Sequence, residues 1–189
     1  MELNTYPLVC TRGVVLYPNQ EIVIDVGRDT SVHAVENAQD NYDKKICLFS
    51  QKELEKENPG KEDIYPVGTL CEVRHIRRFD NFLRVKFRGI KRVKLNNWIN
   101  GSLSDLAEVE ILESEKQDAV EEEALIRMIA DELDRMQGQD RFVTKEIVME
   151  ISKGMGGEFL SDKAVQGLPL DIERKQQYLE TLGVNDRLM

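Results

Sequence analysis

Long apolar runs are missing from this sequence. No stretch approaches the roughly 20 consecutive apolar residues that a membrane-spanning helix needs. The start of the chain also lacks the basic segment followed by an apolar stretch that is typical of a secretory signal. We therefore expect no membrane partner and no export.

Cysteine is scarce and scattered. Cys10, Cys47 and Cys71 are odd in number, lie far apart in the sequence, and each falls within a strand-like run. A disulfide framework or a zinc site would instead need paired or clustered cysteines. This pattern predicts reduced thiols in a protein core and a cytoplasmic location.

The motifs of catalysis and of cofactor binding are absent as well. Residues 154–157 are rich in glycine but lack the lysine with which a phosphate loop reaches its ligand, which favours a helix break there. His33 and His75 stand alone, without the neighbouring ligands of a zinc site. We therefore predict no catalytic residue, no bound cofactor and no metal site in these 189 residues.

The chain contains charged and apolar residues in ordinary amounts. Its 189 residues are 41% hydrophobic and 32% charged, enough for a normal core and a wet surface. The net charge of −9 is uneven, because residues 1–107 carry 16 basic and 15 acidic side chains and residues 108–189 carry 10 and 20. Such asymmetry indicates two units with different surfaces.

The front half is typical of a sheet. Two short apolar runs rich in β-branched residues, within residues 7–18 and 21–26, are bounded by Gly13 and Pro18 and are typical of buried strands. Asp29 or Thr30 is expected to cap a following helix. Four more strands are predicted over residues 45–51, 69–79, 82–94 and 106–112. Asp80-Asn81 suits a two-residue hairpin turn, since both residues tolerate left-handed backbone angles.

The period changes to that of helices from Ser114 onward. Ala119, Ile126, Ile129, Leu133 and Met136 form one stripe of a long helix, which residues 138–140 are expected to stop. A second apolar stripe consists of Val143, Ile147, Ile151 and Met155.

Two shorter helical segments are expected after this second stripe. One covers residues 159–165, and the other starts near Asp171 and has Gly183 as its C-cap. Short connections between such helices favour a compact bundle.

Several segments, in order along nearly the whole chain, resemble the N-terminal domain of bacterial ATP-dependent Lon proteases. The segments are Pro7–Pro18, Ile46–Gln51, Asp63–Thr69, Val85–Arg92, Leu168–Leu170 and Lys175–Leu182. The resemblance implies an α+β fold, with a β-rich pseudo-barrel (PUA-like, about six strands plus one helix) followed by a long helix and a helical bundle. The corresponding boundaries are 1–113 for the β-rich domain, 114–137 for the long helix, 138–184 for the bundle and 185–189 for the start of a truncated helix that leads to the ATPase.

The resemblance also implies a function. A Lon protease is an ATP-dependent serine protease of protein quality control, and its phosphate loop, Ser–Lys dyad, ATP and Mg would lie downstream of this segment. The present chain would then recognise unfolded or damaged proteins without itself cleaving peptides or ATP. The parent would be a homohexamer, and self-association of the fragment is expected to be weak or absent.

Four residues beside turns are the predicted substrate contacts: Tyr17, Pro18, Phe79 and Phe82. A ring next to a turn is harder to bury, and clustered exposed aromatic groups are typical of an interaction site. The competing interpretation of such apolar residues is packing in the core.

Two other functions stay open at this point. The basic run over residues 74–94 could bind phosphates on a PUA-like module, but no recognition motif accompanies it, so nucleic acid is not the favoured partner. A stand-alone substrate adaptor without an ATPase is the other alternative.

Overall fold

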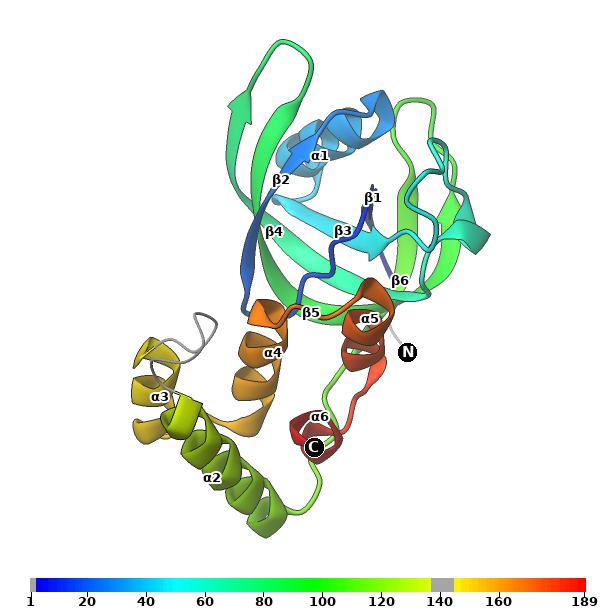
Figure 1. Cartoon of the computed structure of the whole chain (residues 1–189). Coiled ribbons are helices and arrows are strands. Elements are labelled where there is room, and N and C mark those ends of the chain that lie inside the picture. The colour runs from blue at the N-terminus through cyan, green and yellow to red at the C-terminus, as the bar shows by residue number, and fades with distance from the viewer. Residues whose placement is uncertain (1–2, 137–144) are drawn as a thin grey trace. The chain divides into compact units, whose positions relative to one another are not determined.

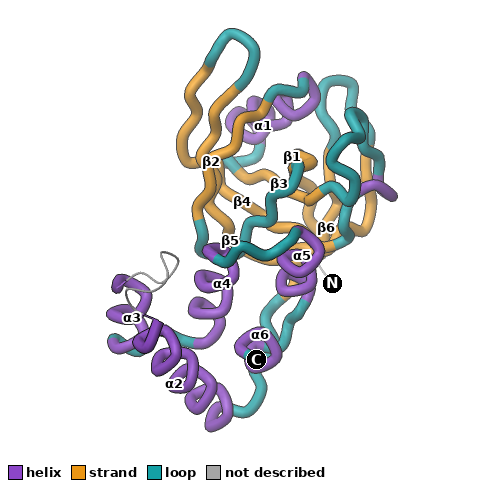
Figure 2. Tube along the Cα trace, in the orientation of Figure 1, coloured by secondary structure: helices purple, strands orange, loops and turns teal. Residues whose placement is uncertain are grey.

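The computed structural model describes residues 3–136 and 145–189. The chain divides into two compact units, Met1–Leu112 and Glu113–Met189, the first rich in strands and the second made of helices (Figures 1 and 2). No helix in the described residues is both long and apolar enough to cross a membrane.

In its described part, from Leu3 onward, the first unit holds six strands, one α-helix and one 3-10 turn. These elements are β1 (Leu3–Thr11), β2 (Glu21–Val26), α1 (Asp29–Asn41), β3 (Lys45–Ser50), η1 (Lys61–Asp63), β4 (Val67–Arg78), β5 (Leu83–Ile99) and β6 (Leu106–Leu112). The predicted α+β class and six-stranded sheet are confirmed. The apolar run Val14–Tyr17, however, forms a loop rather than a strand.

The sheet closes on itself at one end and stays open at the other. Its order is β2-β5-β4-β3-β1-β6, and β6 pairs with β5 as well, so that five strands form a ring with β2 attached outside it. The long β5 carries β2 on its first part, Leu83–Arg88, and β6 on its second part, Arg92–Ile99. Along β1, the pairing with β6 covers only the first part of the strand, Leu3–Pro7. Beyond that point β1 and β2 face each other without pairing.

Two apolar clusters fill the first unit, and α1 covers one of them. Ala34, Val35 and Ala38 of α1 are fully buried against strand residues such as Phe87. α1 begins at Asp29 with Arg28 as the N-cap and without a side-chain cap. The predicted capping by Asp29 or Thr30 is therefore wrong, because both residues already lie inside the helix.

The hairpin between β4 and β5 is confirmed, but its turn is not of the expected type. The backbone N–H of Phe79 donates to the carbonyl of Phe82 over 2.9 Å and closes the turn. Neither Asp80 nor Asn81 has the positive φ found at Asn19, Asp43 and Lys44. The turn is therefore not the one that places both central residues in the left-handed region.

Within residues 113–136 and 145–189, the second unit has five helices: α2 (Ala119–Met136), α3 (Lys145–Ser152), α4 (Gly157–Gly167), α5 (Ile172–Glu180) and α6 (Val184–Leu188). Leu160, Val184 and Leu188 form its buried centre, and the apolar stripe of α2 packs on it through Ile126 and Ile129. The predicted stop at residues 138–140 and Val143 of the second stripe lie outside the described residues.

The end of the second unit differs from the expectation. α5 starts next to Asp171, as predicted, and Asp171 caps it by accepting the N–H of Arg174 over 2.8 Å. α5 ends at Glu180, however, and Gly183 is the N-cap of α6 rather than a C-cap. α6 packs against α2 and α4. Tertiary contacts of this kind stabilise a helix of five residues that would not hold in isolation.

Candidate functional site

Two aromatic rings stand at the tip of the hairpin between β4 and β5, which projects beyond the rest of the first unit (Figure 1). Phe79 and Phe82 stack with centroids 4.6 Å apart and planes inclined by 13°. Both side chains are half-buried. Two of the four predicted contacts therefore come together on one accessible surface.

Arginine side chains frame this aromatic pair. The guanidinium of Arg77 lies 5.0 Å from the centre of the Phe79 ring, and that of Arg84 lies 5.4 Å from Phe79 and 5.6 Å from Phe82. Asp25 holds Arg84 in place through hydrogen bonds of 2.7 and 2.8 Å, which lower the pKa of the aspartate. Cation–π contacts of this kind stabilise exposed rings by about 0.5–1 kcal/mol.

The other two predicted contacts do not belong to this surface. Tyr17 is 0% exposed and Pro18 is buried, so the expected exposure of the Tyr17 ring is wrong. The loop that carries them is held against the sheet, since the hydroxyl of Thr69 in β4 donates a hydrogen bond to the carbonyl of Leu16 over 2.5 Å. A Cβ placed on Gly89 would lie 2.1 Å from the Tyr17 carbonyl oxygen, which shows how closely the loop lies on β5.

The basic run over residues 74–94 is partly neutralised within the first unit. Its cations form ion pairs in four places: Arg74 with Glu72, Arg78 with Glu36, Arg84 with Asp25, and Lys86 with Glu21. Paired cations offer less to a phosphate backbone, and the nucleic-acid alternative is not favoured.

Arg92 is buried, unlike the other Lys and Arg side chains of this basic run. The alternation of buried and exposed residues holds from Leu83 to Arg88 and then breaks, leaving Arg92 only 2% exposed. Register shifts between β4 and β5 on the Leu70/Cys71 side accompany this break. A bulge changes which face a side chain takes, and the sequence alone does not reveal it.

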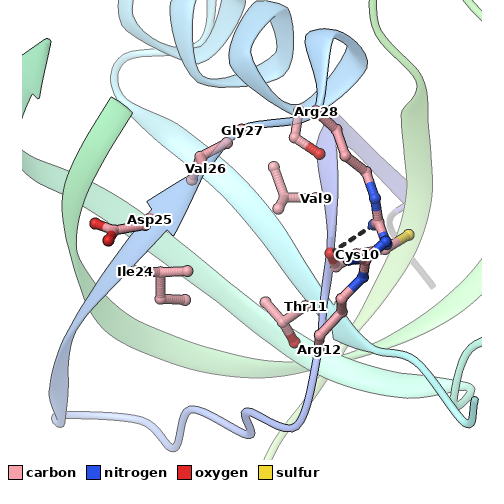
Figure 3. Close-up of a pocket in the computed structure, with 10 residues that line it drawn as sticks. Val9, Cys10, Thr11, Arg12, Ile24, Asp25, Val26, Gly27 and Arg28 are labelled. Carbon is pink, nitrogen blue, oxygen red and sulfur yellow. Dashed lines mark hydrogen bonds between the residues drawn. The ribbon is translucent and has the colours of Figure 1, made fainter. Parts of the chain in front are cut away.

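A cavity of about 320 Å³ lies between β1 and β2 at the open part of the sheet. Val9, Ile24 and Val26 contribute apolar lining, and Arg12 and Arg28 contribute cations. Figure 3 shows the two arginine side chains reaching toward each other beside Cys10. Sequence reasoning missed this cavity, although an arginine next to a glycine at each of two strand ends (Arg12-Gly13 and Gly27-Arg28) was the available signal.

The three cysteines carry free thiols. Cys47 and Cys71 are fully buried, as predicted for core thiols, while Cys10 is half-buried at the cavity. Burial raises the pKa of Cys10 to about 12 and raises the pKa of the other two thiols as well. A thiol with so high a pKa is a poor nucleophile near neutral pH.

Metal ligation and phosphate binding find no support in the residues described. Within 3–136 and 145–189, no group of three or more His, Cys, Asp or Glu side chains is arranged to hold a metal ion. Gly154 takes a φ of +88°, and Gly156 is the N-cap of α4. The glycine run is therefore a break between two helices, as predicted.

Comparison with known proteins gives one consistent result. The family model of the ATP-dependent protease La (LON) substrate-binding domain matches residues 5–189. Lon protease of Buchnera aphidicola is 31% identical over 188 residues, which cover 99% of this chain and 24% of the relative. Lon protease of Syntrophomonas wolfei is 33% identical over 191 residues, which cover 99% of this chain and 23% of the relative. The chain thus spans about a quarter of the length of the curated relatives it matches.

Two solved structures share the fold. The N-terminal domain of a Mycobacterium avium complex Lon protease aligns with a TM-score of 0.77 at 18% identity, over 98% of this chain and 94% of that one. A Lon N-terminal domain protein from Xanthomonas campestris aligns with a TM-score of 0.68 at 15% identity, over 98% and 95% of the two chains.

Proposed function

The chain belongs to the ATP-dependent protease La (LON) substrate-binding domain family, and from this membership we propose that it captures exposed apolar segments of unfolded or damaged proteins. One observation supports the proposal most directly. The stacked rings of Phe79 and Phe82 stand half-exposed at the end of a projecting hairpin, where an unfolded chain can reach them.

The chemistry of this hairpin tip suits binding with low sequence specificity. Ring faces contact any apolar side chain, and the neighbouring guanidiniums of Arg77 and Arg84 keep the tip soluble while it is empty. Covering two half-exposed rings contributes roughly 1–3 kcal/mol. After the cost of ordering the bound segment, a single tip binds weakly, in the millimolar-to-micromolar range.

We further propose that the chain serves as the N-terminal substrate-recognition part of a cytoplasmic, ATP-dependent serine protease of Lon type. The relatives that support this proposal are named Lon protease and are about four times as long as the matched segment. In this proposal ATP, Mg and the proteolytic groups belong to the parent outside these 189 residues. Homohexamer assembly of the parent, with weak or no self-association of the segment alone, would multiply weak capture by avidity.

The experiment that tests the tip replaces both rings by serine (Phe79→Ser with Phe82→Ser) and measures capture of a reduced, carboxymethylated test protein by fluorescence anisotropy. We expect at least about ten-fold weaker capture, since most of the apolar area at the tip is removed. Loss of the stacking contact lowers the stability of the fold by about 0.5–1.5 kcal/mol, and the lost burial of the two half-buried rings adds to this, so the melting temperature of the variant is measured alongside capture.

The matched control is Leu103→Ser, which removes a 65% exposed apolar side chain from another loop of the same unit. We expect its capture to equal that of the unaltered chain. Undiminished capture by the folded double variant would refute the role of the aromatic pair. Tyr17 is left out of this design because serine at a fully buried position would unfold the domain.

A further inference from the structure

The open part of the sheet forms a groove between β1 and β2, and β2 presents an edge there without a partner in the described part of the sheet. β2 pairs with β5 alone among the described strands, so its other edge is free where Ile24–Val26 line the cavity. Cys10–Arg12 line the opposite wall, beyond the part of β1 that β6 covers. A strand edge with free backbone groups is a template for an added extended segment.

The lining of this groove continues the core of the unit. Val9 and Val26 are each 4% exposed and belong to the apolar cluster beneath α1, against which Ile24 also packs. A volume of about 320 Å³ lies at the lower end of the range for ligand pockets. It has room for an apolar side chain together with a small polar group.

The cations at the groove lack a carboxylate partner. Arg28 donates to three neutral acceptors, the carbonyls of Cys10 and Lys56 over 3.3 and 3.2 Å and the side-chain oxygen of Gln51 over 2.6 Å. In the part of the chain that the structure describes, neither Arg28 nor Arg12 has a carboxylate within ion-pair distance.

The surroundings compensate this positive charge only in part, since Glu57 and Asp105 lie at the neighbouring cavity and form no ion pair with either arginine. The one carboxylate among the lining residues, that of Asp25, is already bound to Arg84. Burial and, after it, repulsion by Arg12 lower the pKa of Arg28, and electrostatic interactions with Cys10 and Glu57 act in the opposite direction. α1 also starts beside Arg28 without a side-chain cap, and the carboxylate of Asp29 in its first turn offsets part of the positive end of the helix dipole. An anionic group with two acceptor oxygens is the complement of such a site.

We propose that this groove binds the C-terminal carboxylate of an extended polypeptide whose last side chain is apolar. The carboxylate meets Arg12 and Arg28, the terminal side chain lies against Val9 and Val26, and the preceding residues pair with the free edge of β2. A chain end fits better than an internal aspartate or glutamate, because the carboxylate then terminates a backbone that enters along a strand edge. This inference rests on the proposed function. It adds a second feature of the substrate, its C-terminal carboxylate, which the aromatic pair of Phe79 and Phe82 does not recognise.

The probe is a short fluorescein-labelled peptide that ends in two leucines, prepared once with a free carboxylate and once with a terminal amide. Binding to the whole 189-residue chain is followed by anisotropy at low and moderate salt. We expect the amide to bind at least about ten-fold more weakly, since charge-assisted hydrogen bonds to the carboxylate are lost. The difference should shrink as salt is added.

The variant Arg12→Gln makes the test specific, because this side chain has no internal ion pair whose loss could unfold the protein. We expect it to weaken binding of the free acid about ten-fold and to leave binding of the amide unchanged. The matched control is Arg88→Gln, an exposed arginine of β5 outside the cavity lining, with no expected effect on either peptide.

Equal binding of acid and amide would overturn the inference. So would an amidated peptide with an internal aspartate that binds as tightly as the free acid, since the groove would then read any carboxylate. These results are separable from failure of the proposed function. Capture of the unfolded test protein by the aromatic tip depends on Phe79 and Phe82 and not on Arg12.

Discussion

Replacing Gly89 by alanine is expected to destabilise the first unit severely. Gly89 lies in β5 directly beneath the loop that carries Tyr17 and Pro18. A Cβ there would come within 2.1 Å of the Tyr17 carbonyl oxygen and 3.2 Å of the Pro18 Cα. Both are backbone atoms, so no side-chain rotation relieves the overlap and the loop has to move away.

The magnitude follows from what that movement breaks. Overpacking of a well-packed interior costs about 1–3 kcal/mol. Two backbone hydrogen bonds of 2.9 Å, from Asn19 to Gly89 and from Gly89 to Gln20, contribute roughly 1 kcal/mol each. Together the loss is about 3–5 kcal/mol, a large share of the 5–15 kcal/mol that is typical of a folded domain.

Urea unfolding followed by tryptophan fluorescence measures this loss of stability in the first unit. The single tryptophan, Trp98, packs against the second apolar cluster of the sheet. Gly60→Ala is the control, since its nearest atom lies 3.7 Å from the added Cβ and its φ of −102° suits any residue. We expect the control to stay within about 0.5 kcal/mol of the unaltered chain. A loss below about 1 kcal/mol for Gly89→Ala, at unchanged slope, would refute the close approach of loop and strand.

Two further predictions concern charge. Arg187 is buried in the second unit beside the carboxylate of Asp162, with 3.9 Å between the charged groups. Arg187→Leu should therefore lower the free energy of unfolding by about 3–5 kcal/mol, measured by circular dichroism. The control Arg135→Leu, on the exposed face of α2, should lower it by less than about 0.5 kcal/mol. The second prediction concerns pH. Hydrogen bonding to Arg84 lowers the pKa of Asp25 in the folded state. The stability that ionised Asp25 contributes is therefore fully present above its unfolded pKa of about 4 and is lost as pH falls through the folded pKa. Melting temperatures measured from pH 7 down to pH 3 should therefore fall less steeply for Asp25→Asn, and an unchanged slope would contradict the pairing.

Local chemistry explains why much of the fold could be predicted. Short apolar runs rich in β-branched residues indicate strands through nearest neighbours, and the strand over Leu106–Leu112 was placed with its observed bounds, although the run Val14–Tyr17 forms a loop. Asp171 caps its helix through a bond to a residue three positions away, which a local pattern can indicate. The resemblance to Lon N-terminal domains likewise depends on short segments that remain legible without the fold.

The candidate site was only half predictable, for the same reason. Phe79 and Phe82 flank a tight turn, so their stacking follows from local geometry. The burial of Tyr17 depends on Thr69 and Gly89, which are far away in the sequence and are brought beneath the loop only by strand pairing.

What the sequence by itself determined are the elements, the division into a strand-rich and a helical unit, and the family, because each depends on residue order and on contacts between near neighbours. Only the tertiary structure decided where the sheet stays open. The registers that join β6 to one part of β5 and β2 to another leave a gap between β1 and β2. Arg12 and Arg28 come from separate segments and meet at this gap. Long-range pairing creates that neighbourhood, and no local pattern encodes it.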